Sequence, residues 1–181
     1  MERGQFEGLS AADLIARLRV GVDWFDPRVG ELTNEQLDTA FLPEGGVGRM
    51  PCRVLIGHLA DAELLMVHRM RRVASEEGLV IQPWDQNATI DAGFYGDAAG
   101  GSRHPIGAFV AVIHTLRQWA GVWLGTLSPA QWEKRALHPE YGELTVRRIA
   151  EQDAYHLEHH AWYLNRKVRK LLGEPLGPGA V

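Results

Sequence analysis

The chain has 181 residues, 45% of them hydrophobic, and a formal net charge of −4. A chain of this size can form one domain with a substantial core, and its acidic balance argues against a nucleic-acid-binding protein, which usually carries a basic surface. No apolar run approaches the roughly 18–20 residues that a membrane-spanning helix needs. The first residues lack the basic and then apolar pattern of a secretion signal. Cys52 is the only cysteine. We therefore expect a cytoplasmic protein without an intrachain disulfide.

Two long helices are predicted in the first half of the chain. The first runs from about Ser10 to about Leu32, with apolar residues at helical spacing and a serine suited to the N-cap. The pair Asp26-Pro27 is expected to kink or interrupt it, because proline cannot continue the internal hydrogen bonds of a helix. The second helix runs from about Pro51 to Glu77, where proline suits the first turn.

A long, weakly periodic segment from Gly78 to His104 follows, rich in glycine, aspartate and proline. Connections of this length are usually crossovers, functional loops or disordered stretches. Two more helices are predicted, from near Pro105 to near Gly125 and from near Thr145 to just before Gly173, which suits a C-terminal cap. Because strand patterns are nearly absent, we predict an all-α protein, a single-domain four-helix bundle over residues 1–181. Its long crossover would let the second and third helices run parallel.

A weak internal repeat also favours two helical hairpins. Thr33 and Ser128 each precede a glutamine by three residues, the capping-box pattern that begins a helix. Each box is followed by a Pro-Glu turn, at Pro43 and at Pro139, and then by a helix that carries histidine. The same order in both halves is what a pseudo-two-fold pair of hairpins would produce.

Histidines on two of the predicted helices point to a metal site. His156 and His160 are four residues apart, so both imidazoles lie on one face of a helix and can bind the same ion. They flank the apolar stripe of that helix, whereas His159 falls on its charged side. His58 flanks the apolar stripe of the second helix and is the best third ligand, while His68 lies on a solvated face.

A hydrogen-bonded core residue is the more common role of a lone histidine on an apolar flank. Three neutral imidazoles in one core would leave ring nitrogens to satisfy, which costs a few kcal/mol without a metal. A metal ion removes that cost and favours a joint role for the three. Asp153, one turn before His156, could bind the ion itself. We favour two other roles, orienting a ligand histidine through a hydrogen bond or placing charge near the helix start.

At these residues the sequence resembles the DinB-like superfamily, most closely its YfiT-like branch, described as metal-dependent hydrolases or bacillithiol transferases. The resemblance covers roughly residues 31–164. It rests on the order of five short motifs: Gly57-His58-Leu-Ala-Asp61, Ile81-Gln-Pro83-Trp84-Asp85, Leu127-Ser-Pro-Ala-Gln131, His138-Pro139-Glu140 and Ala154-Tyr-His156-Leu-Glu-His159-His160.

The resemblance implies a four-helix bundle with a long crossover after its second helix, and commonly a homodimer. It also implies a metal held by one histidine of the second helix and two of the fourth. By position these are His58, His156 and His160, the three that the helical spacing selects. Relatives often carry another histidine five residues after the first ligand, where this chain has Glu63. That departure bears on the substrate chemistry and leaves the ligand set intact.

Three protein nitrogens would leave open positions on zinc, nickel or manganese. An open site can make hydroxide from water, which gives a hydrolase, or bind a thiol as thiolate, which gives a transferase. Guided by the resemblance, we predict transfer of a small thiol such as bacillithiol to an electrophile. Hydrolysis is the alternative, and a non-enzymatic metal-binding or stress-response protein is a third reading. Cys52 is read as a small apolar residue at a helix start and not as a nucleophile.

The residues that would complete the chemistry are less sharply indicated. Trp84 and Asp85 could line the mouth of the site and bind a cofactor, or could anchor the crossover on the bundle or on a partner subunit. Four carboxylates are candidates for a general base, although most exposed carboxylates are simply solvated: Asp61, Glu63, Glu140 and Glu158.

Overall fold

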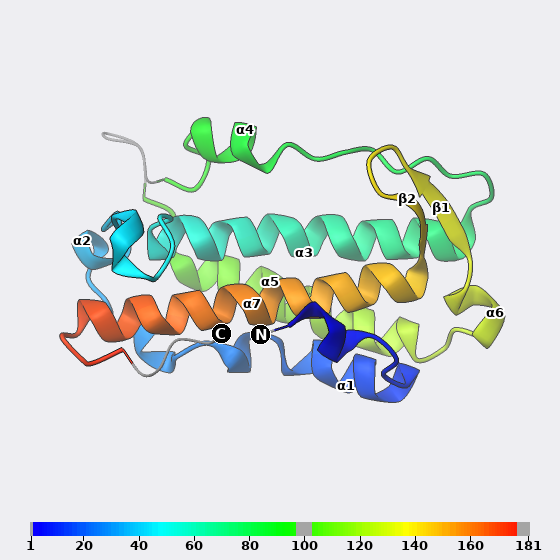
Figure 1. The fold of residues 1–181 in the computed structure, drawn as a ribbon, viewed down its shortest axis with the longest axis horizontal. Helices are drawn as coiled ribbons and strands as arrows, with labels where there is room; N and C mark the ends of the chain where they lie inside the picture. Colours follow the sequence, from blue (N-terminus) through cyan, green and yellow to red (C-terminus); the bar gives the residue numbers. More distant parts are fainter. Residues whose placement is uncertain (1, 97–102, 177–181) are drawn as a thin grey trace.

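The computed structural model describes residues 2–96 and 103–176. Its four main helices form a bundle: α1 (Ala11–Val20), α3 (Cys52–Ser75), α5 (Ile106–Leu124) and α7 (Val146–Leu171). Helix α3 packs against α5 and α7, and α1 packs against both α5 and α7 from the other side (Figure 1). The predicted all-α four-helix bundle is confirmed. Of the helices in the described ranges, none is long and apolar enough to cross a membrane.

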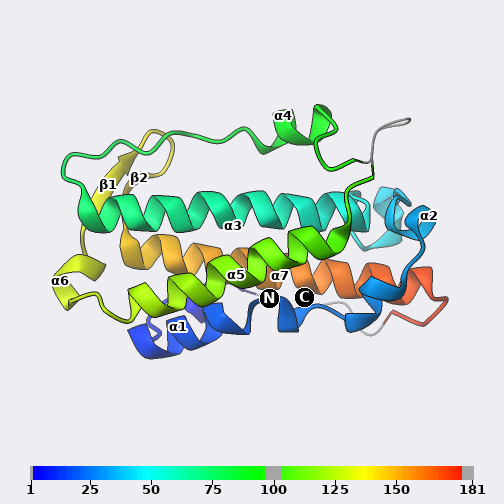
Figure 2. The ribbon, with the colours of Figure 1, turned by 180° about the vertical axis from the view of Figure 1, so that it is seen from behind.

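The predicted crossover sets the direction of the helices. After α3 the chain runs back along the whole bundle, forms the short helix α4 (Gln86–Asp91), and reaches the start of α5 (Figure 2). Helices α3 and α5 therefore point the same way, while α1 and α7 point the opposite way. This arrangement brings α7 beside α3 in antiparallel orientation, so that histidines of the two helices can meet.

The first predicted helix is shorter than expected. It ends at Val20, before the predicted interruption at Asp26-Pro27, and continues as two 3₁₀ turns, η2 (Gly21–Trp24) and η3 (Pro27–Glu31). Gly21 has φ +50°, which side-chain-bearing residues rarely adopt. A Cβ at this glycine would lie 3.2 Å from Cδ of the buried Arg117. The helix therefore ends where its backbone passes a side chain from a distant part of the sequence.

Short elements at the two ends of the bundle begin with the expected caps. Helix α2 (Asn34–Leu37) and helix α6 (Pro129–Trp132) each start with a complete capping box, formed by Thr33 with Gln36 and by Ser128 with Gln131. Ser10 caps α1 as predicted, its hydroxyl oxygen accepting from the backbone N–H of Asp13.

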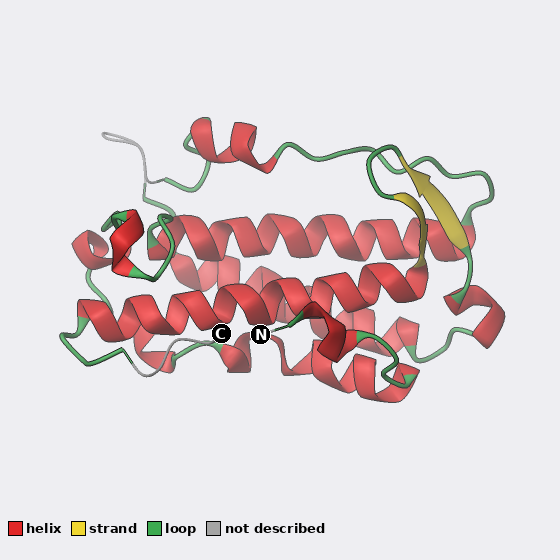
Figure 3. Cartoon of the chain, viewed as in Figure 1, coloured by secondary structure: helices red, strands yellow, loops and turns green. Residues whose placement is uncertain are grey.

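A β-hairpin that the sequence analysis did not predict precedes α7. Its strands are β1 (Arg135–His138) and β2 (Gly142–Thr145), and the Pro139-Glu140 turn forms its tip (Figure 3). The crossover pairs with the outer edge of β1, since the Ile81 N–H donates to the Leu137 carbonyl at 2.8 Å and the Leu137 N–H donates to Leu79 at 3.0 Å. This pairing fixes the start of the crossover beside the hairpin tip.

The core has two hydrophobic clusters, one at the hairpin end of the bundle and one at the α2 end. A buried polar layer from three helices lies between them. Arg117 of α5 donates to Glu63 of α3 at 2.6 Å and to Asp153 of α7 at 3.1 Å. All three side chains are at most 2% exposed. This buried layer therefore contains two carboxyl groups and one guanidinium group.

The far end of the crossover is fixed on α3 by Tyr95. Its hydroxyl donates to Asp61 at 2.8 Å, and its ring covers Gly57, where a Cβ would lie 2.4 Å from ring atom Cδ1. Thus Gly57 and Asp61 of the Gly-His-Leu-Ala-Asp motif both contact Tyr95. In the sequence they stand on either side of His58. The glycine is required by close approach of the ring, since its backbone is an ordinary helical one.

We expect Gly57→Ala to destabilise the fold. The new methyl group would overlap the Tyr95 ring, and overpacking of this kind costs about 1–3 kcal/mol. Chemical denaturation measures the loss, with Gly107→Ala as the control, because a Cβ at that helical glycine meets no atom within 4 Å. Equal stability of the two variants would contradict the close packing of Tyr95 on α3.

Candidate metal centre

Three imidazoles from two helices converge in the middle of the bundle. Each of His58, His156 and His160 offers a ring nitrogen, and these nitrogens all lie within 4.8 Å of one another. The Nε2 atoms of His58 and His156 are 3.2 Å apart. Two imidazole nitrogens bound to one tetrahedral zinc at about 2.0–2.1 Å would be about 3.4 Å apart. The arrangement therefore fits a divalent ion with little movement.

Local structure explains why these rings meet. His156 and His160 are one turn apart on α7, and their ring centroids are 4.6 Å apart. His58 approaches from α3, the antiparallel neighbour of α7. Trp84 of the crossover stacks on the His58 ring, with centroids 5.6 Å apart and planes 9° from parallel. Trp84 thus both anchors the crossover and fixes the plane of a candidate ligand.

Burial keeps the three rings neutral. It is the main cause that lowers the pKa of each below the ordinary 6.5, to about 3 for His160 and well below 6.5 for His156. Each of these two is lowered further by its histidine neighbours. Neutral imidazoles keep a lone pair for a metal at neutral pH. Nδ1 of His58 is buried without a hydrogen-bond partner among the described residues, so the cluster is not a closed hydrogen-bond network.

Two other residues of α7 that the sequence analysis considered, His159 and Asp153, lie outside this cluster. The ring of His159 stacks on Tyr155 and contacts Tyr163, and its Nδ1 is 3.4 Å from the Tyr155 hydroxyl. The carboxylate of Asp153 accepts from Arg117 and, among the described residues, from no histidine. The hydrogen bond to a ligand histidine that we favoured for Asp153 is therefore not formed.

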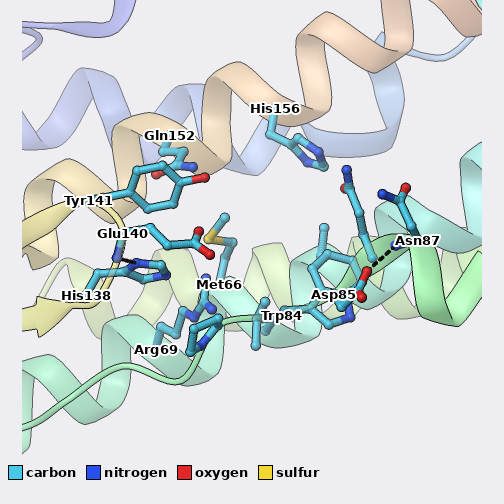
Figure 4. A pocket seen from close by; sticks show the side chains of 14 residues that line it. Met66, Arg69, Trp84, Asp85, Asn87, His138, Glu140, Tyr141, Gln152 and His156 are labelled. Carbon is cyan, nitrogen blue, oxygen red and sulfur yellow. Dashed lines mark hydrogen bonds between the residues drawn. The ribbon is translucent and has the colours of Figure 1, made fainter.

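A pocket of about 480 Å³ opens beside the cluster and includes His156 in its wall. Figure 4 shows His156 and the crossover residues Asp85 and Asn87 on one side of the space, and Arg69, His138 and Glu140 on the other. The pocket is bounded by α3, α7, the crossover and the hairpin tip. It has the size of a small-molecule site. Its lining residues are Ala62, Leu65, Met66, Arg69, Pro83, Trp84, Asp85, Gln86, Asn87, His138, Glu140, Tyr141, Gln152 and His156.

The four candidate carboxylates have different surroundings. Asp61 accepts from the Tyr95 hydroxyl, and Glu63 belongs to the buried layer around Arg117. Glu158 is 1% exposed and accepts two hydrogen bonds from Arg17, at 2.6 and 2.8 Å. Of the four, only Glu140 is among the residues that line the pocket. Asp85 also lines it, but its carboxylate caps α4 by accepting from the N–H groups of Asn87 and Ala88.

Sequence reasoning did not single out Arg69, Tyr141 or Gln152 as pocket residues. One signal was available for Arg69, which follows His58 by eleven positions, close to three full helical turns, and therefore lies on the same face of α3. Gln152 likewise precedes His156 by one turn of α7. Tyr141 reaches the pocket through the hairpin, which the sequence analysis did not predict.

Comparisons with known proteins identify the family of this chain and agree with its fold. A family model described as "DinB superfamily" matches residues 17–164. A protein of Oceanobacillus iheyensis, named "Putative metal-dependent hydrolase", is 30% identical over 77% of this chain and 75% of its own length. A Bacillus mycoides protein of the same name is 24% identical over 79% of this chain and 76% of its own.

The fold is similar to that of a solved structure. YfiT from Bacillus subtilis, described as "a probable metal-dependent hydrolase with an unusual four-helix bundle topology", superposes with a TM-score of 0.76 and 20% identity. The superposition covers 93% of each chain. At this identity the likeness supports the fold and carries no residue roles by itself.

Proposed function

This chain belongs to the DinB superfamily, and from that membership and the three-histidine cluster we propose that it is a metal-dependent enzyme acting on a small molecule. The convergence of His58, His156 and His160 beside an open pocket is the observation that supports this most. Within the described residues no fourth metal-binding side chain joins the three. A three-ligand site with room for a small molecule favours catalysis over a closed structural site and over the non-enzymatic reading.

The donor set fits zinc or nickel, since imidazole suits borderline divalent ions, and fits the predicted alternative manganese less well, since that ion prefers oxygen ligands. Such an ion supplies Lewis acidity, which lowers the pKa of a thiol or a water molecule that reaches it. The chain contributes the rest. Trp84 holds the plane of His58, the crossover covers the site, and the pocket orients the partner molecule.

The finer proposal is transfer of a low-molecular-weight thiol of the bacillithiol type to an electrophile. The thiol loses its proton, its sulfur forms a bond to the electrophilic carbon, and the leaving group departs with the bonding electrons. Among the four candidate bases only Glu140 lines the pocket, but it lies at the end away from His156 (Figure 4), so we assign the proton of the thiol to solvent water. Hydrolysis is the second candidate and is favoured by one observation, the names of both curated relatives. The homodimer and the cytoplasmic location stay predictions.

We expect a cobalt-loaded sample to separate these two activities. A small thiol such as bacillithiol or cysteine should produce a sulfur-to-metal charge-transfer band, and conjugation of a model electrophile should require both metal and thiol. Metal-dependent cleavage of an ester or amide, with no thiol perturbing the cobalt spectrum, would replace transfer by hydrolysis. Absence of both activities in a fully protein-coordinated centre would overturn the enzyme proposal.

A further inference from the structure

The pocket extends away from the histidine cluster along α3. His58 and Arg69 lie on the same face of this helix, and eleven residues correspond to about 16 Å along its axis. Ala62, Leu65 and Met66 line the pocket between them. In Figure 4, Arg69 lies with Glu140 and His138 at the end of the space away from His156. The pocket therefore has a metal-ligand end and an arginine end.

In the part of the chain that the structure describes, Arg69 has no carboxylate partner of the kind that Arg17, Arg53 and Arg117 have. Its Nη2 donates to the Gln82 carbonyl at 2.6 Å, but its Nε is buried without a partner among the described residues. Within that part of the chain no carboxylate lies within 4.0 Å of it. By contrast, Arg17, Arg53 and Arg117 each bind a carboxylate directly. Burial lowers the pKa of Arg69, and the nearby Tyr141 and Glu140 oppose that effect in part.

The neighbours of Arg69 include two further hydrogen-bond donors. Nδ1 of His138 accepts from the Glu140 backbone N–H at 3.2 Å, so a neutral His138 carries its proton on Nε2. Tyr141, which is 65% exposed, brings its hydroxyl to the same pocket. Glu140 is the one acid at this end, and its exposed side chain stays more than 4.0 Å from the guanidinium, where water screens it.

We propose that Arg69 is the specificity residue of the pocket and binds an anionic group, a carboxylate or a phosphate, at the far end of the substrate. The inference rests on the proposed function, because it assumes that the reacting end of the ligand reaches the histidine cluster. Because the side chains of Arg69 and His58 both lean toward the N-terminus of α3, the distance between the anion and the metal is on the order of 10–16 Å. The ligand class is therefore an elongated molecule with one anionic end.

A matched pair of thiols tests this assignment. 8-Mercaptooctanoate and 8-mercaptooctanol have the required length and differ in the charge of the far end. Each is titrated into cobalt-loaded protein while the charge-transfer band is recorded. The parent should bind the carboxylate at least about tenfold more tightly, the usual effect of a hydrogen bond to a charged group. Arg69→Gln should abolish that preference, chiefly by weakening the binding of the carboxylate.

The control variant is Arg71→Gln, which removes the same charge from the same helix outside this pocket, where the guanidinium stacks on Trp119. It should keep the full preference for the carboxylate. An Arg69→Gln protein that still prefers the carboxylate would overturn the proposal, and so would equal losses in both variants, because that result would indicate a general charge effect.

A second measurement does not need thiol chemistry. In zinc-supplemented ¹⁵N-labelled protein, the Nε–H signal of Arg69 is identified by its absence in Arg69→Gln and followed during addition of octanoate or inorganic phosphate. A shift with octanoate alone assigns a carboxylate, and a shift with phosphate alone assigns a phosphate. No shift with either refutes the anion site. If no thiol perturbs cobalt while the Nε–H signal shifts, the thiol-transfer proposal fails and the role of Arg69 stands.

Discussion

Replacing His58, His156 or His160 by alanine should each remove stoichiometric metal from the protein. A site of three imidazoles that loses one keeps two, and we expect its affinity for zinc to fall by more than about 100-fold, since loss of an outer-sphere partner alone costs 10–100-fold. Elemental analysis of purified protein and calorimetric titration with zinc measure the effect. Each truncation also removes a buried imidazole ring from the core. Circular dichroism should therefore verify that the variants remain folded.

His159→Ala is the matched control for this series. It removes an imidazole from the same turn of α7, but one that contacts Tyr155 and Tyr163 and lies outside the cluster. It should retain most of the bound zinc. If His58→Ala holds as much metal as the parent, α3 supplies no ligand and the site would need another third residue. If His159→Ala loses metal as the others do, the choice of the inward pair on α7 is wrong.

The parts of this structure that the sequence predicted well depend on local signals. The spacing of apolar residues identified α3, α5 and α7, and the capping boxes at Thr33 and Ser128 formed as expected. The same helical periodicity selected His58, His156 and His160, because a side chain on the flank of a core stripe must point toward a neighbouring helix. Knowing which side of each helix carries the histidines was enough to predict that the three imidazoles could meet.

The parts that were missed depend on partners distant in sequence. The first helix ends at Val20, and the glycine that follows it lies against Arg117, almost a hundred positions away. The β-hairpin is held partly by its pairing with the crossover, and strands of four residues leave little periodic signal. Glu63 and Asp153 were considered for roles at the site, yet both turn toward Arg117. No local pattern in the sequence reveals that Arg117 on α5 forms ion pairs with carboxylates of both α3 and α7.

The buried layer around Arg117 gives the largest expected effect on stability. Arg117→Met keeps the length of the side chain but leaves Glu63 and Asp153 buried without a cation. Breaking a buried ion pair in this way costs about 3–5 kcal/mol, which is a large part of the stability of a single domain. Urea denaturation should show the loss at unchanged m-value. The double variant Glu63→Gln with Arg117→Met should be less destabilised than Arg117→Met alone, because it leaves one buried carboxyl group without the guanidinium in place of two.

The same layer predicts how stability depends on pH. Burial, together with the neighbouring Asp153, raises the pKa of Glu63 above its ordinary 4.5. Above pH 4.5 the folded protein therefore keeps a proton that the unfolded chain releases, so this contribution to stability is complete below that pH and is lost as pH rises. The slope is about 1.4 kcal/mol per pH unit for one proton.

Glu63→Gln has no carboxyl group to titrate at this position, so its stability relative to the parent should increase from pH 5 to pH 8. The buried histidines are common to both proteins, so the difference between their stabilities at each pH isolates the contribution of the Glu63 carboxyl group.

The two carboxylate oxygens of Glu63 have different surroundings. Glu63 accepts from Arg117 through Oε2, whereas its Oε1 and Oδ2 of Asp153 are buried without partners among the described residues. A proton held between the two carboxylates would satisfy both oxygens and leave the layer neutral. Parallel pH profiles for the parent and Glu63→Gln would instead mean that both carboxylates remain ionised beside a single guanidinium.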